Sequence, residues 1–145
     1  MIELVTAMAI LAILLTASMP MLQSVMNSSR SRSAAQRMQE DLQWAEGQAI
    51  QGNTDVSFIL NGSDCGGSAW EIKNSSGAVL RCMSRTDFSA LYRQVSITPT
   101  GATPLSINSL GVIGGLNGGA LPVNFTAGTS IRTLTVLYSG RCDVS

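Results

Sequence analysis

The residue most able to do chemistry is Glu3, the only charged side chain in an apolar run from Ile2 to about Leu22. A carboxylate in an apolar environment is costly unless something neutralises it. Two opposite charges within hydrogen-bond distance compensate each other, whereas one alone is penalised. The position of Glu3 therefore predicts a need for a counter-charge.

The other ionisable groups do not indicate catalysis. The chain has no histidine, which excludes Ser-His-Asp catalysis, Cys-His nucleophiles and histidine metal sites. Its three cysteines form no Cys-x-x-Cys motif, so we expect no metal and no cofactor. Net charge is zero, so there is no overall attraction to nucleic acid or anionic lipid. Four carboxylates could in principle pair as acid and base, but no spacing supports this: Asp55, Asp64, Glu71 and Asp87. We expect no enzyme activity.

The run that carries Glu3 must be a helix in an apolar environment. About 20 helical residues span about 30 Å, the thickness of the hydrocarbon layer of a membrane. Pro20 lies near the far end and predicts a kink. A cleaved secretory signal is an alternative, with small residues at 16–18 near a possible cut. No basic region precedes the run, however, and the run is long for such a signal.

The helical pattern continues after Pro20 in an amphipathic style. One apolar stripe recurs at steps of three and four residues, formed by Ala35, Met38, Leu42, Ala45 and Ala49. We predict a single helix over residues 2–51, ended by Gly52-Asn53. Its second half, 23–52, should pack on the domain that follows.

Residues 53–145 read as an antiparallel β-rich domain, which makes the fold class α+β. Segments rich in β-branched and aromatic residues predict strands at 55–60, 69–73, 79–83, 94–98, 121–125 and 132–139. Residues 74–77, Asn-Ser-Ser-Gly, are typical of a hairpin turn. We interpret the glycine-rich stretch 111–120 as a flexible surface loop. The predicted divisions are therefore 1–22, 23–52 and 53–145.

The segment IELVTAMAILAILLTASMP resembles the N-terminus of type IV pilins and of type II secretion pseudopilins. Glu3 matches the glutamate at the family's fifth mature position, and Pro20 matches a proline that many members share. The resemblance implies a pilin fold and assembly with other pilin subunits through the N-terminal helix. In it, Glu3 would meet the N-terminal amine of a neighbouring subunit, which would also set the axial register.

The same resemblance implies a single-pass location in the bacterial inner membrane before assembly and a periplasmic or extracellular filament afterwards. In this family a prepilin peptidase cuts a leader after glycine and methylates the new phenylalanine. Here Met1 falls where the third mature residue should be. The peptidase is therefore expected as a partner of the full-length precursor only.

The remaining sequence is similar to minor subunits of the GspH/FimT/FimU group, whose closing strand often ends in Gly-Arg, as Ser139-Gly140-Arg141 does here. Such subunits prime or cap a filament. Some FimT-like members bind DNA through Gly-Arg-x-Arg. This chain has Asp143 in place of the second arginine, so Arg141 and Arg132 are weak DNA-binding candidates. Other arginines that could cluster with them are Arg81, Arg85 and Arg93.

The three cysteines fit an exported domain. If the hairpin pairs Lys73 with Val79, Trp70 lies opposite about Cys82. Cys65 then reaches Cys82 only if the loop between them folds back. Two pairings stay open: Cys65–Cys82, which we prefer, and Cys82–Cys142, which would tie down the C-terminal region as in many pilins.

Overall fold

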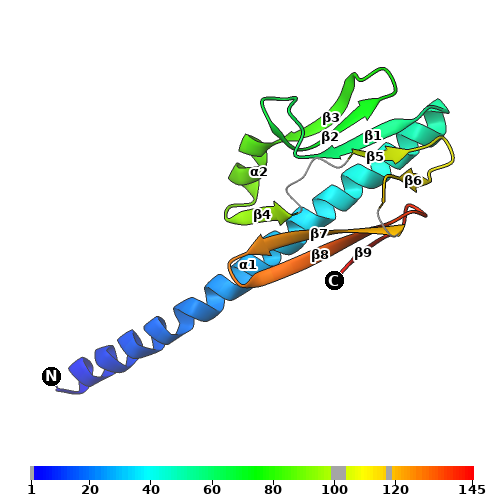
Figure 1. The fold of residues 1–145 in the computed structure, drawn as a ribbon. Coiled ribbons are helices and arrows are strands. Elements are labelled where there is room, and N and C mark those ends of the chain that lie inside the picture. The colour runs from blue at the N-terminus through cyan, green and yellow to red at the C-terminus, as the bar shows by residue number, and fades with distance from the viewer. Residues whose placement is uncertain (1, 99–103, 117–118) are drawn as a thin grey trace.

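The fold is one long helix whose second half is covered by a β-rich domain, while its first half projects (Figure 1). The computed structural model describes residues 2–98, 104–116 and 119–145, without the side chains of residues 2, 5, 9, 13 and 15–20. Helix α1 runs from Ile2 to Gly52, which confirms the predicted single helix. It is continuous through Pro20, and the kink at that residue stays a prediction.

Two antiparallel sheets cover the second half of α1. The first has the order β3-β2-β1-β5-β6 and the second the order β4-β7-β8-β9. The strands of the first sheet are β1 (Val56–Leu60), β2 (Ser68–Asn74), β3 (Val79–Ser84), β5 (Pro104–Ile107) and β6 (Ile113–Gly114). Those of the second are β4 (Val95–Thr98), β7 (Ala120–Ala127), β8 (Ser130–Leu137) and β9 (Cys142–Val144).

The core lies between α1 and the two sheets. All five residues of the predicted apolar stripe of α1 are completely buried, together with Ala34. They pack with large side chains from both sheets, among them Phe58, Trp70, Phe125 and Leu134. The stripe is therefore the docking face of the helix, as its periodicity predicted.

The hairpin between β2 and β3 begins as predicted and then shifts. Asn74 accepts hydrogen bonds from the backbone N–H of Ala78 at 2.8 Å and from the Ser76 hydroxyl at 2.7 Å. Lys73 pairs with Val79, but the register then shifts by one residue, so Trp70 faces Met83 and Glu71 faces Cys82. The expected Trp70–Cys82 pairing is therefore wrong, because a β-bulge inserts one extra residue into β3.

Outside the glycine-rich stretch, three elements were not predicted from the sequence. The first is α2 (Arg85–Leu91), a short helix capped by Ser84, whose hydroxyl accepts from the backbone N–H of Asp87 at 3.0 Å. The others are β5 and β9, which have four and three residues. Such short elements carry too little periodicity to be recognised.

The glycine-rich stretch is not simply a flexible surface loop. Ile113 is buried, and β6 pairs with β5. Gly115 has φ +86°, and a Cβ there would lie 2.8 Å from the carbonyl oxygen of Pro104. The glycine thus allows a close approach of two backbones that the composition alone did not indicate.

Candidate assembly surface

The projecting half of α1 begins with Glu3 in its first turn. The side chain of Glu3 is exposed, and no ion pair found in the described part of the chain includes it. The Thr6 hydroxyl donates to the backbone carbonyl of Glu3 at 2.9 Å. A negative charge in the first turn of a helix is favoured by the helix dipole, but nothing described compensates it as an ion pair would.

The same half of α1 exposes large apolar side chains. Met21 retains 75 % of its surface and Leu4 67 %, and the other large exposed ones are Met8, Ile10, Leu11, Leu14, Leu22, Val25 and Met26. They lie on several faces of the helix, so one partner face cannot cover them all. An apolar surface of this extent indicates an interaction site. Among the described residues, no helix meets the length and hydropathy expected of a membrane span.

The exposed part of α1 ends where the second sheet first contacts it. Arg132 on β8 donates from Nη2 to the Ser28 hydroxyl at 3.2 Å. A Cβ on Gly128, in the turn between β7 and β8, would lie 2.9 Å from the side-chain nitrogen of Asn27. Ser31 is completely buried, and it is the first such residue among the side chains described in the helix. The globular domain therefore holds α1 from about residue 27 onward.

A buried carboxylate fastens α1 to the first sheet. Asp41, with 3 % of its side chain exposed, accepts a hydrogen bond of 2.8 Å from the indole Nε1 of Trp70. The Arg81 guanidinium on β3 lies 3.2 Å from the other oxygen of Asp41 and 5.3 Å from the centre of the Trp44 ring. No local pattern in the sequence predicts this network: Asp41 had no expected role, and Arg81 was considered only as a possible DNA contact.

A second network fixes the loop between β1 and β2. Lys73 lies 2.7 Å from Glu71 and 2.9 Å from Asp64. Hydrogen bonds to Glu71 and then to Asp64 raise the pKa of Lys73. Glu71 also accepts from the Ser68 hydroxyl at 3.0 Å and from the backbone N–H of Asp64 at 3.1 Å.

The disulfide lies in the same region. Cys65 is bonded to Cys82, with their Cα atoms 6.8 Å apart, and Cys142 is a free thiol. Burial raises the pKa of the Cys142 thiol to about 12, which keeps it protonated and unreactive near neutral pH.

The four carboxylates considered for acid–base chemistry do not form one site. Asp64 and Glu71 come together, but both share the positive charge of Lys73. Asp87 accepts from Ser84 at the start of α2, and Asp55 is exposed in the turn before β1. Among the described residues, no cluster of side chains suits a metal ion.

The two DNA-binding candidates are also separated. Arg141 lies 3.3 Å from Asp143 beyond the end of β8, and Arg132 lies near its start. Arg132 and Leu137 are five positions apart, which is about 17 Å along a strand, and the backbone of Leu137 bonds to that of Arg141. Arg81 is engaged with Asp41. The structure therefore does not bring these three arginines together.

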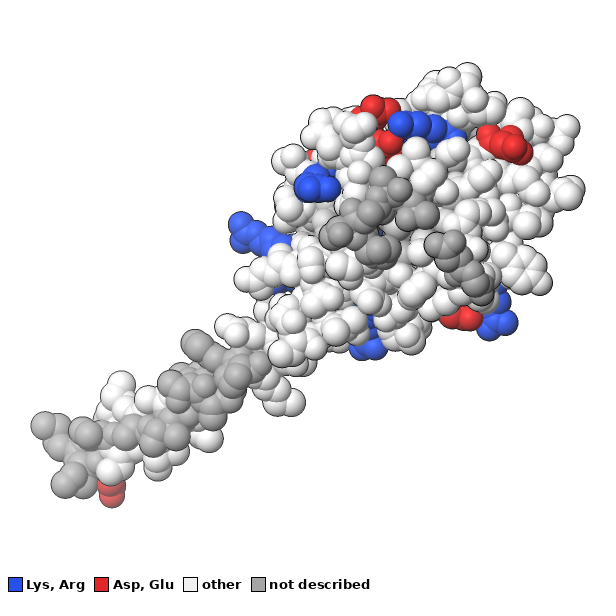
Figure 2. Space-filling view, in the orientation of Figure 1, with Lys and Arg blue, Asp and Glu red and all other residues white. Residues whose placement is uncertain are grey.

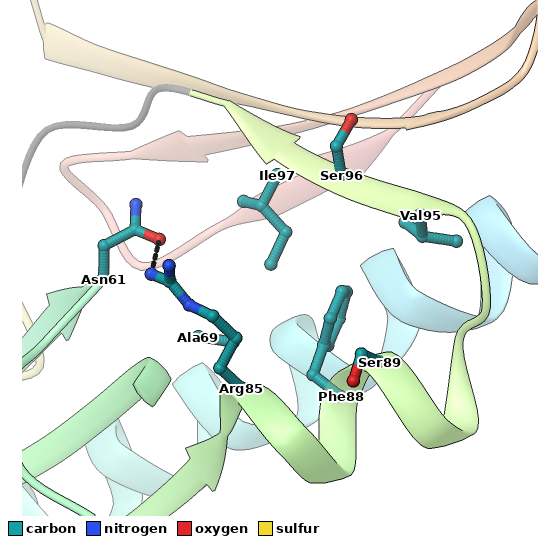
Figure 3. A pocket seen from close by; sticks show the side chains of 8 residues that line it. All are labelled: Asn61, Ala69, Arg85, Phe88, Ser89, Val95, Ser96 and Ile97. Carbon is teal, nitrogen blue, oxygen red and sulfur yellow. Dashed lines mark hydrogen bonds between the residues drawn. The ribbon is translucent and has the colours of Figure 1, made fainter. Parts of the chain in front are cut away.

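One hollow of about 380 Å³ lies between α2 and β4 (Figure 3). Phe88 and Ile97 point into it from opposite sides, and Arg85 donates to the Asn61 amide oxygen at 3.3 Å across its end. Among the described residues that line it, Arg85 alone is ionisable, and one arginine does not suit acid–base catalysis.

Comparison with known proteins agrees with this architecture. A family model described as type II transport protein GspH matches residues 34–140. Two crystal structures of the type IV minor pilin FimU from Pseudomonas aeruginosa are similar, with TM-scores of 0.56 and 0.57. They are 16 % and 18 % identical in sequence, and each match covers 79 % of this chain and 91 % or 87 % of theirs. No curated protein matches significantly.

Proposed function

Because this chain belongs to the GspH family of type II transport proteins, we propose that it is a non-enzymatic minor subunit of a type IV pilus or of a type II secretion filament. In this role the projecting half of α1 packs against the helices of other subunits, and Glu3 binds the N-terminal amine of a neighbour. The inner membrane holds this half before assembly, and the prepilin peptidase acts on the full-length precursor.

The observation that carries the proposal is the contrast between the two halves of α1. The second half buries its apolar stripe in its own domain, whereas the large apolar side chains described in the first half are exposed. Packing against apolar helices or lipid would remove that surface from water. The carboxylate of Glu3 would then lose its water. In a protein interior this costs roughly several kcal/mol, unless a positive charge lies close enough to form an ion pair. An amine on a neighbouring helix supplies that charge only in one axial register.

The test is incorporation into filaments by variants of the full-length gene. We expect Glu3→Ala and Glu3→Gln to insert in the membrane but to be lost from sheared filaments, because both remove the charge that selects the register. Glu40→Gln is the matched control, since Glu40 is an exposed carboxylate on the same helix. Filament incorporation of the Glu3 variants at the level of the control would refute the role of Glu3.

DNA uptake and a secreted β-domain released from a signal peptide were the alternatives. The separation of Arg132 from Arg141 gives no support to the first, and the membership of the GspH family does not favour the second.

A further inference from the structure

Four arginines surround α1 at the point where it leaves the globular domain. Arg30 and Arg32 lie on α1, Arg93 follows α2, and Arg132 lies near the start of β8. Arg30 and Arg93 line one hollow, together with Ser89 and Gln94. Arg32 and Arg132 line another. The fold therefore brings together residues up to about a hundred positions apart, and we name Arg30, Arg32, Arg93 and Arg132 the basic collar.

No ion pair in the described part of the chain includes a collar arginine, and the C-terminal residue Ser145 lines the hollow of Arg32 and Arg132. The ion pairs found there use Arg37, Lys73, Arg81 and Arg141. Between Glu3 and Glu40 the sequence has no acidic residue. Glu40 lies ten residues, about 15 Å, beyond Arg30 along the helix. On the face drawn in Figure 2, the junction between helix and domain is bordered by blue side chains and by no red ones.

The collar follows directly on the projecting apolar surface. Met26, the last large apolar residue of the exposed half, is four residues or about 6 Å before Arg30. Gln23 and Asn27 line a hollow with Arg30 and add polar groups at the same level. An apolar helix, then amides, then guanidinium groups is the order of polarity that a helix meets on leaving a bilayer.

We propose that the basic collar binds the anionic headgroups of phospholipids and seats the globular domain on the membrane surface before assembly. This inference rests on the proposed function, since it requires the projecting half of α1 to be in lipid. Guanidinium groups bind phosphate oxygens through two parallel hydrogen bonds, and arginines next to a membrane are attracted by anionic lipid.

The arrangement of the collar favours a lipid surface over an acidic protein. Arg30 and Arg32 are two positions apart on a helix, so their side chains leave it in directions roughly 200° apart. Arg93 lines a hollow with Arg30 and Arg132 lines one with Arg32, so each adds a positive charge on one side of the helix. A membrane surrounds the helix and contacts all four arginines at once, whereas one protein partner would face one side.

The test compares binding of the full chain to vesicles of phosphatidylcholine alone and to vesicles that also contain phosphatidylglycerol. Energy transfer from Trp44 and Trp70 to a labelled lipid reports the bound fraction. The collar variant is Arg30→Gln/Arg93→Gln. The control, Arg85→Gln/Arg141→Gln, removes the same charge from sites outside the collar, and circular dichroism checks that both variants fold.

We expect the collar variant to bind the anionic vesicles on the order of tenfold more weakly than the parent chain. Binding to neutral vesicles should not change, and the difference should shrink at high salt. The affinity of the control for anionic vesicles should stay within about twofold of that of the parent chain, since its arginines lie away from the membrane surface.

Four outcomes would overturn the proposal. Equal loss in the two double variants would assign the effect to net charge alone. Equal binding of the parent chain to neutral and anionic vesicles would remove the collar's role and leave the proposed function intact. Binding to neither vesicle would refute the membrane stage of the proposed function, and the collar with it. If duplex DNA binding alone responded to the collar variant, the collar would be a nucleic-acid site instead.

Discussion

The indole Nε1 of Trp70 donates a hydrogen bond of 2.8 Å to Oδ2 of Asp41, across 29 positions of sequence and inside the core. This bond joins α1 to β2, and Arg81 adds an ion pair from β3. The Asp41 network therefore links the helix to the first sheet of the domain. The Asp41 network is one polar connection that resists their separation.

We expect Asp41→Ala to lower the free energy of unfolding by about 3 kcal/mol, because it leaves Trp70 without an acceptor and Arg81 without its counter-charge. Trp70→Phe should cost roughly 1–3 kcal/mol, since it removes the donor and keeps most of the ring. Urea unfolding of the full chain in mild detergent measures both. Glu40→Ala, which removes an exposed neighbouring carboxylate, should stay within about 0.5 kcal/mol. If Asp41→Ala and Trp70→Phe were as stable as Glu40→Ala, the network would not contribute to the free energy of unfolding.

Glu46 predicts a pH dependence of stability. It packs against the turn at Gly140, where a Cβ would lie 2.9 Å from its Oε1, and near Cys142. Burial raises the pKa of Glu46 to about 7, from an ordinary value of 4.5. The folded state therefore holds this proton more tightly than the unfolded state. The stabilisation is complete below about pH 4.5, falls as the pH rises, and is lost above about pH 7.

Glu46→Gln removes this titration and keeps the shape of the side chain. Urea unfolding at a series of pH values should show the variant more stable than the parent chain above pH 7, with the difference vanishing towards pH 4.5. Glu40→Gln is the control, because Glu40 is exposed. Parallel pH curves for the parent and Glu46→Gln chains would contradict the prediction.

The disulfide predicts a loss of stability on reduction. Cys65 and Cys82 are separated by 17 positions, and closing a loop of this size in the unfolded chain is worth roughly 3 kcal/mol. We expect Cys65→Ser/Cys82→Ser to lower the free energy of unfolding by about that amount and to abolish the effect of a reductant. Cys142→Ser should leave the effect of the reductant intact. Non-reduced peptide mapping that joined Cys82 to Cys142 would overturn the pairing.

Two glycines predict opposite effects of the same substitution. A Cβ on Gly62 would collide with the carboxylate of Glu71, which is buried and held by Lys73. Gly62→Ala should therefore cost about 1–3 kcal/mol through overpacking. Gly47 lies within α1, and beyond the adjoining helix backbone no atom lies within 4 Å of the added Cβ, so Gly47→Ala should stabilise by about 0.5–1 kcal/mol. Thermal unfolding of both variants gives the signs, and the same sign for both would contradict this account.

The sequence by itself determined the features that repeat over many neighbouring residues. The single helix followed from an apolar run joined to a stripe with steps of three and four, and all five stripe residues are buried. The start of the hairpin at Lys73 and Val79 followed from local turn chemistry. These patterns are readable because both periodicity and turns depend on residues close in sequence.

Only the tertiary structure decided the features that depend on distant neighbours. Because of the β-bulge, the cross-strand partner of Cys82 is Glu71 and not Trp70. A close approach of two backbones places Ile113 of the glycine-rich stretch in the first sheet. Contacts with other elements gave Asp41 its hydrogen bond to Trp70 and its ion pair with Arg81, and burial raised the pKa of Glu46. Folding also brought the basic collar together from three separate parts of the chain. Desolvation and charge compensation are set by which surfaces meet, and no local pattern in the sequence records that.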